Sequence, residues 1–190
     1  MTIQELFVAA NRALEASISQ IKDDQWELDM PPGTSMKPST LRQAVQYHTY
    51  DDAWVPDVLA GKTKDEVGDQ YEALLTNDTV LESYKEYNHR ANEAVSSFNE
   101  LDKTTHLSYG DFPAGEYLQH ITSFRAFRSY DIAKLIGIDT RMDPEFVQAL
   151  IDEFTPVIEF YRSVGVFPPA LPVADDATPQ QKLLAMVGRQ

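Results

Sequence analysis

The residues with the clearest chemical potential are an arginine and an aspartate three positions apart, Arg128 and Asp131. At this spacing the two side chains lie on the same side of a helix and can form an ion pair. Asp51 and Asp52, in another predicted helix, are alternative carboxylate partners for the same cation. We interpret Arg128 first as one half of a structural salt bridge in the interior. An arginine that binds a small carboxylate ligand has the same sequence signature, so such a ligand is the alternative.

Two histidines suggest a second chemistry, which is metal binding. His48 lies in a predicted helix, and His120 lies on the same helix face as Arg128, two turns earlier. Neutral imidazole is a ligand for zinc and nickel, so a relocated pair of His48 and His120 could bind either ion. Two histidines without further ligands form a poor site, and isolated histidines usually form hydrogen bonds or face water. We therefore predict no bound metal or other cofactor.

Aromatic residues accompany these polar groups. The aromatic side chains expected in the core are Tyr47, Trp54, Phe124, Phe127 and Tyr130. Large apolar rings usually fill the interior, and in fewer cases they line a pocket for an apolar ligand. If a pocket exists, the side chains expected to line it are His48, Asp52, Trp54, His120 and Asp131.

The composition excludes several classes of function. The 190 residues include no cysteine, which rules out disulfides, thiolate metal sites and a cysteine nucleophile. With 30 acidic and 16 basic residues, the formal charge of −14 opposes binding to nucleic acid and to anionic membranes. Neither a signal-peptide pattern nor a long apolar run is present, so we expect a cytoplasmic protein.

Helices must position these residues, and the sequence predicts an all-α fold. Capping boxes and apolar residues spaced three and four apart indicate most of the helices. The helices are predicted over about residues 2–22, 38–61, 63 onward, 79–98, 113–137, 144–164 with a kink at Pro156, and 178–188. No segment shows the alternation typical of a strand. We expect one domain with a core over about residues 2–165, followed by an extended segment and a short helix over residues 166–190.

A resemblance to a known family spans nearly the whole chain. The segments that carry it are residues 39–45, 54–61, 131–137, and 167–169 with 183–189. In this order they resemble the DinB-like proteins of the mycothiol-dependent maleylpyruvate isomerase type found in actinobacteria. The resemblance implies an up-down four-helix bundle that holds zinc or nickel near one end, where the metal activates a thiol or a water.

The resemblance also implies where the metal ligands would lie. The family pattern places one ligand on the second helix and two on the helix that ends at Gly137, which correspond to Tyr47, Phe124 and Arg128 in this chain. Phenylalanine has no donor atom, arginine stays protonated, and tyrosine is an uncommon ligand for these ions. The metal site is therefore expected to be degenerate. Whether Tyr47 or His48 faces the interior is open, because adjacent helical residues point about 100° apart.

Together these observations predict a DinB-like protein with a degenerate metal site. We expect it to bind a small apolar or carboxylate ligand, or to have a structural role, without catalysis and as a homodimer. The alternative is a metal-dependent and mycothiol-dependent transferase or isomerase that uses an altered ligand set, including His48 and His120.

Overall fold

A computed structural model describes residues 1–31 and 39–190 of the chain. The chain divides into two compact units, Met1–Asp139 and Thr140–Gln190. The sequence placed the end of the core at about residue 165, whereas the boundary between the units lies between Asp139 and Thr140. We describe each unit by itself.

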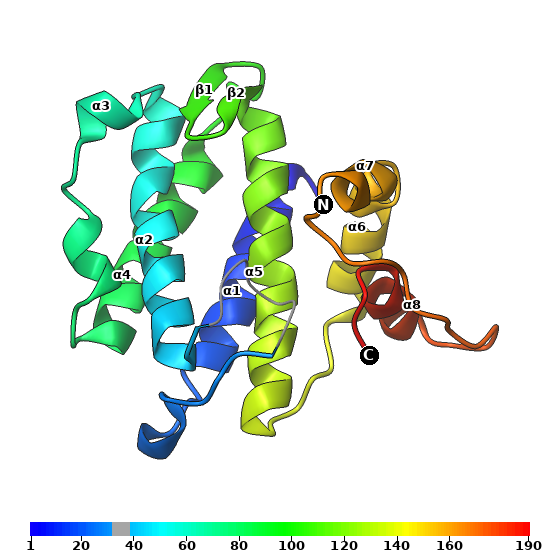
Figure 1. The fold of residues 1–190 in the computed structure, drawn as a ribbon. Helices are drawn as coiled ribbons and strands as arrows, with labels where there is room; N and C mark the ends of the chain where they lie inside the picture. Colours follow the sequence, from blue (N-terminus) through cyan, green and yellow to red (C-terminus); the bar gives the residue numbers. More distant parts are fainter. Residues whose placement is uncertain (32–38) are drawn as a thin grey trace. The chain divides into compact units, whose positions relative to one another are not determined.

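The first unit is mostly helical, as predicted. Its elements are α1 (Ile3–Ile18), η1 (Asp23–Gln25), α2 (Leu41–Ala60), α3 (Lys64–Val67), η2 (Glu72–Leu75), α4 (Val80–Ser97), β1 (Thr104–Leu107), β2 (Gly110–Pro113) and α5 (Ala114–Ile136). The four long helices α1, α2, α4 and α5 run alongside one another, and the β-hairpin lies at one end of α2 and α5 (Figure 1). No helix of the described residues is both long enough and apolar enough to cross a bilayer.

Local sequence signals fix most helix ends. Thr2, Thr40 and Thr63 each form a capping box, in which the threonine side chain accepts a hydrogen bond from the backbone N–H three residues later. At the other end, α2 and α5 stop at the left-handed glycines Gly61 and Gly137. The start of the second helix was predicted at residue 38, which lies outside the described residues.

The expectation that no strand is present was wrong. β1 and β2 form an antiparallel hairpin in which Thr105 pairs with Phe112 and Leu107 pairs with Gly110. Thr105 is fully buried, and its hydroxyl donates to the carbonyl of Phe112 at 2.8 Å. Lys103 attaches the hairpin to α2, because its Nζ donates to the carbonyls of Leu59 and Ala60, each at 3.0 Å, at the C-terminal end of that helix.

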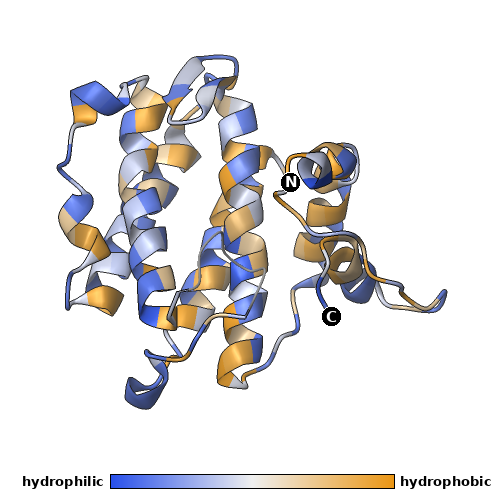
Figure 2. Cartoon of the chain, viewed as in Figure 1, coloured by the Kyte–Doolittle hydropathy of each residue, from blue (hydrophilic) through white to orange (hydrophobic). Residues whose placement is uncertain are grey.

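The core of the first unit consists of two apolar clusters. The first contains Leu14, Ile18, Val45, Tyr84 and Ile132 among its buried members. The second cluster includes the buried side chains Phe7, Val55, Ala91, Val95 and Leu118. Both clusters draw residues from α1, α2, α4 and α5, and hydrophilic residues occur between the hydrophobic ones along these helices (Figure 2).

The second unit contains three helices, α6 (Pro144–Phe154), α7 (Ile158–Ser163) and α8 (Pro179–Met186). The prediction of one kinked helix over residues 144–164 was wrong, since α6 ends before Pro156 and a separate helix follows. Proline has no N–H to donate and its ring clashes with the preceding turn, which explains the break. Asp143 and Thr178 cap α6 and α8 through their side chains, as the sequence indicated.

Gly188 makes a close approach that no other residue type permits. It has φ 73°, and a Cβ at this position would overlap the ring of Pro168. We expect Gly188→Ala to destabilise the second unit by about 2–4 kcal/mol, through the left-handed backbone and the steric overlap together. Amide hydrogen exchange of α8 measures this effect.

Gly137 provides the matched control for this prediction. It also has φ 73°, but nothing lies within 4 Å of a Cβ placed there. Gly137→Ala should therefore lower the free energy of opening at the end of α5, as measured by amide exchange, by only about 1–2 kcal/mol. Equal costs at the two glycines would contradict a steric role for Pro168.

Candidate functional site

A layer of buried polar side chains separates the two apolar clusters. Each long helix of the first unit contributes one member, Asn11 from α1, Asp52 from α2, Asn88 from α4 and Arg125 from α5. Each of these side chains is at most 1% exposed. We call these four residues the polar layer. Burying polar groups of this kind is costly unless they form hydrogen bonds. The stability of the unit therefore depends on the partners of these four side chains.

The main interaction of the polar layer is an ion pair between Arg125 and Asp52. Arg125 Nε donates to Asp52 Oδ1 at 3.0 Å, and Arg125 Nη2 donates to the same oxygen. Arg125 Nη1 donates to the carbonyl of Ile121 at 2.9 Å, and the guanidinium lies over the ring of Phe7. Burial opposes the charge of Arg125, but the carboxylates of Asp52 and Asp51 outweigh it and hold the Arg125 pKa above its ordinary value.

Three amides extend this ion pair toward α1 and α4. Asn88 Nδ2 donates to Tyr84 Oη at 2.9 Å and to Asp52 Oδ2 at 3.4 Å. Asn92 Nδ2 donates to Asn88 Oδ1 at 2.9 Å, and Asn11 Nδ2 donates to Asn92 Oδ1 at 3.1 Å. These bonds form a continuous hydrogen-bonded chain through the interior of the unit. We interpret this chain first as a feature that stabilises the fold.

His48, rather than Tyr47, faces the interior. His48 is 4% exposed, and its Nδ1 has no hydrogen-bond partner among the described residues. Burial, followed by the positive charges of Arg128 and Arg125, lowers the pKa of His48 well below its ordinary value. The imidazole is therefore neutral at pH 7. Tyr47 is 57% exposed, so the expectation that this ring belongs to the core was wrong.

A half-buried carboxylate forms the second feature of the site. Asp51 follows Tyr47 by one helical turn on α2, and no hydrogen bond connects it to another described residue. Burial, opposed by the charge of Arg125 and reinforced by that of Asp52, raises the pKa of Asp51 to about 7. At neutral pH this carboxyl group therefore exists in both its ionised and its protonated form.

Three tyrosines, from α2, the hairpin turn and α5, lie close enough to Asp51 for its charge to raise their pKa values. The charge of Asp51, with burial, raises the pKa of Tyr47 to about 12. Burial and the charge of Asp51 also raise the pKa of Tyr109, in the hairpin turn, to about 12, and they raise that of Tyr117 on α5. All three phenols therefore stay protonated at pH 7, and none donates a hydrogen bond to Asp51 in the described structure. We call Asp51, Tyr47, Tyr109 and Tyr117 the Asp51 cluster.

Neighbouring rings hold Tyr109 in place. The Tyr109 ring lies 5.5 Å from that of Phe112 and 5.9 Å from that of His120, measured between centroids. Tyr109 Oη and His120 Nδ1 are 3.3 Å apart, and His120 Nε2 lies 3.7 Å from a carboxylate oxygen of Glu116. Burial lowers the pKa of His120, although Glu116 opposes this. His120 therefore contacts Tyr109 through both its ring and its Nδ1.

The remaining predicted residues occupy varied environments. Phe124 is 49% exposed, so its assignment to the core was wrong, whereas Phe127 and Tyr130 are buried as expected. Trp54 is half-buried and contacts the rings of Tyr50 and Tyr71. Arg128 and Asp131 are both buried. Asp52, one of the three carboxylates expected as partners of Arg128, pairs with Arg125.

The residues at the expected ligand positions do not fit a divalent metal. Two of the three, Tyr47 and Phe124, are exposed, and the third is an arginine. Within residues 1–31 and 39–190, no group of three or more histidine, aspartate or glutamate side chains could hold an ion. The positive charges of Arg125 and Arg128 act on His48 and oppose a further cation beside it.

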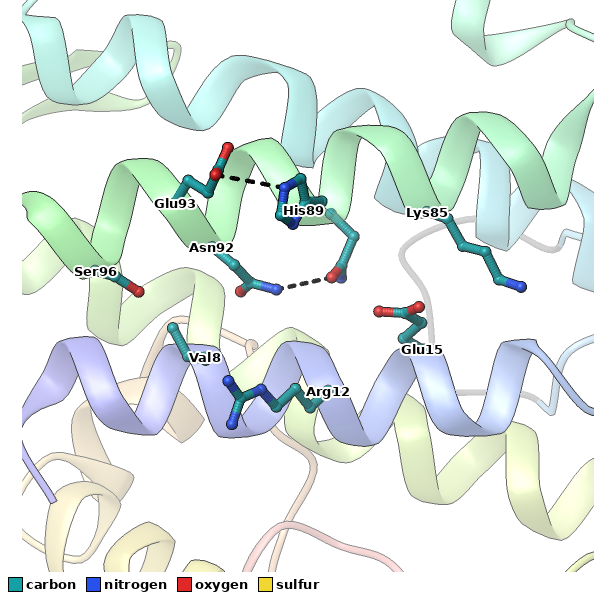
Figure 3. A pocket seen from close by; sticks show the side chains of 9 residues that line it. Val8, Arg12, Glu15, Lys85, His89, Asn92, Glu93 and Ser96 are labelled. Atoms are coloured by element: carbon teal, nitrogen blue, oxygen red, sulfur yellow. Dashed lines mark hydrogen bonds and ion pairs between the residues drawn. The ribbon is translucent and has the colours of Figure 1, made fainter.

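A separate depression of about 400 Å³ lies between α1 and α4 (Figure 3). Its walls carry exposed charges of both signs, including Arg12, Glu15 and Lys85, and its floor contains Asn88 and Asn92. The two floor amides use their hydrogen bonds within the chain that leads to Asp52. The polar groups that remain for a ligand are therefore the charged and polar side chains at its rim, several of which are exposed to solvent, and we take the Asp51 cluster as the stronger candidate.

The polar layer has a signal in the sequence, which the predictions from sequence missed. Asn11 occupies a core position between Phe7 and Leu14, and Asn88 occupies one between Tyr84 and Ala91, with spacings of four and three. Arg125 lies seven residues from Leu118 and from Ile132 in the same way. A polar residue at a core position of each long helix indicates a buried network.

Comparisons of the chain with family models, with curated proteins and with solved structures found no match. The resemblance to DinB-like proteins therefore rests on the sequence segments given above. The functional proposal rests on the residues of the site and on their geometry.

Proposed function

We propose that this chain is a DinB-like helical protein that lacks the metal of that family and binds a small organic molecule at the Asp51 cluster, without catalysing a reaction. The observation that carries the proposal is a half-buried carboxylate without a hydrogen-bond partner, among aromatic rings of which two, Tyr47 and Tyr109, are exposed. Sites for small molecules combine apolar walls with a few polar groups that orient the ligand.

The position of the cluster supports this proposal. Tyr47 stands at one of the ligand positions implied by the family resemblance, and Asp51 lies one turn further along the same helix. Phe124, at another of these positions, follows Tyr117 by seven residues and therefore lies on the same side of α5. Aromatic side chains thus stand at two of the three positions at which the resemblance implies metal ligands.

The absence of a metal is directly testable. We expect protein purified without chelator to contain far less than one equivalent of zinc or nickel, as measured by elemental analysis. EDTA should leave the melting temperature unchanged, and added zinc should not raise it, because a ligand stabilises a protein only when it binds the folded state preferentially. Near-stoichiometric metal would contradict the proposal and favour the metal-dependent and thiol-dependent transferase or isomerase.

Binding at the cluster is tested with three phenyl compounds of nearly equal size. These are 2-phenylethylammonium, 2-phenylethanol and 3-phenylpropanoate, which carry a positive, a zero and a negative charge. Saturable NMR shifts of Tyr47 and Tyr109 with any one of the three would support a small-molecule site. If none of them binds at millimolar concentration, the proposed function is wrong.

A further inference from the structure

We infer that the ligand of the Asp51 cluster is an organic cation, either an amine or a quaternary ammonium group carried on an apolar body. This inference rests on the proposed binding function and names the chemical class of its ligand. It follows from the charges that surround the cluster and from the aromatic surface that the cluster exposes.

Asp51 interacts with the charge of Arg125 but has no hydrogen-bonded counterion among the described residues. Arg125 is the cation whose field reaches Asp51, but both Nε and Nη2 of Arg125 donate to Asp52. The charge of Arg128 acts on His48. Glu116 adds a second negative charge near Tyr109. A bound cation would therefore give Asp51 the direct partner that Arg125 does not provide.

The aromatic rings provide the second half of the recognition. Tyr47 and Tyr109 are 57% and 60% exposed, and they come from α2 and from the hairpin turn. The face of an aromatic ring attracts ammonium groups, with a strength of about 0.5–2 kcal/mol per ring depending on desolvation. A carboxylate beside several tyrosines is therefore suited to an organic ammonium ion.

The other two ligand classes fit less well. A carboxylate ligand would meet Asp51 and Glu116, and the repulsion would add to the cost of removing its charge from water. A neutral apolar ligand would cover Asp51 without giving it a partner, which is costly for a buried charge. The carboxylate ligand expected from the sequence depended on Arg128, whose charge acts on His48.

The same three phenyl compounds test this inference, by calorimetric titration at roughly pH 8, where Asp51 is mostly ionised. We expect 2-phenylethylammonium to bind at least about tenfold more tightly than 2-phenylethanol or 3-phenylpropanoate, and added salt to reduce this preference. Asp51→Asn should abolish the preference for the cation. Asp69→Asn removes an exposed carboxylate outside the long helices and should leave the preference unchanged.

Two variants of Tyr109 separate the role of the ring from that of its hydroxyl. Tyr109→Phe keeps the aromatic face and should retain most of the affinity for 2-phenylethylammonium. Tyr109→Ala should weaken binding by about fivefold, which corresponds to the loss of one cation–π contact.

The outcomes distinguish the inference from the function on which it rests. If the alcohol or the carboxylate binds as tightly as the amine at these tyrosines, a small-molecule site exists but its ligand is not a cation. If Asp51→Asn leaves the preference for the amine intact, the assignment of Asp51 is wrong. If no compound binds, the proposed function fails as well.

Discussion

Replacing Arg125 by methionine is expected to destabilise the first unit by about 3–5 kcal/mol, because it leaves the carboxylate of Asp52 buried without its cation. Methionine keeps much of the apolar stem that packs near Phe7, so the loss reflects the charge rather than the volume. Both tryptophans of the chain, Trp26 and Trp54, lie in this unit, so urea unfolding followed by tryptophan fluorescence reports its stability selectively.

An exposed arginine supplies the control for this experiment. Arg90 on α4 lies near Glu86 in an exposed i,i+4 pair, and Arg90→Met should change stability by less than about 1 kcal/mol. Combining Arg125→Met with Asp52→Leu should cost less than the sum of the two single changes, since no unpaired buried charge is left. A cost below about 1 kcal/mol for Arg125→Met alone would contradict the central role of the ion pair.

Replacing Asp51 by asparagine is expected to stabilise the first unit above neutral pH. Because the pKa of Asp51 is raised from 3.8 to about 7 on folding, the folded state retains a proton that the unfolded state has lost between these values. The wild-type protein should therefore lose stability as the pH rises from about 4 to 7, by up to roughly 4 kcal/mol. Below pH 4 the carboxyl is protonated in both states and contributes no difference.

The measurement compares wild type and Asp51→Asn by tryptophan-detected urea unfolding across this pH range. The difference between the two proteins isolates Asp51, because other titrating groups contribute to both. Asp69→Asn changes an exposed carboxylate and should follow the wild-type pH dependence. If Asp51→Asn is no more stable than wild type at pH 8, the carboxylate is better solvated or better paired than the structure indicates.

Most of the helices could be predicted because their end signals are local. Thr2, Thr40, Thr63 and Thr178 form capping boxes with residues three positions away, and no distant contact is needed for them to act. The hairpin could not be predicted in this way. Its strands are four residues long, and only Thr105 among their side chains is buried, so the apolar alternation of a strand never develops.

The orientation of α2 was the main difficulty at the site. The buried positions Leu41, Val45, His48, Asp52 and Val55 follow a regular spacing of four and three. His48 and Asp52 interrupt this apolar series with polar groups. From the sequence alone, the aromatic Tyr47 was therefore expected to be buried in place of the polar His48. The buried ion pair compensates for placing Asp52 inside, and that pairing depends on a residue 73 positions away.

The choice between Arg125 and Arg128 required three-dimensional information for a similar reason. Both arginines are buried on α5, and the charges of both act on His48 of α2. Three residues correspond to nearly one helical turn, so the two guanidinium groups project from similar directions at different heights. Which of the two arginines meets Asp52 depends on how α2 and α5 are shifted along their axes relative to each other.

The polar layer also restricts how the first unit can move. If one long helix slid by a turn, about 5.4 Å, its polar residue would leave the layer and enter an apolar cluster without hydrogen bonds. Sliding of the helices is therefore costly, and a conformational response to a ligand is expected in the part of the Asp51 cluster that lies outside them. That part is the hairpin turn carrying Tyr109, and we expect the response there, because the two bonds of Lys103 to the end of α2 hold only the start of the hairpin.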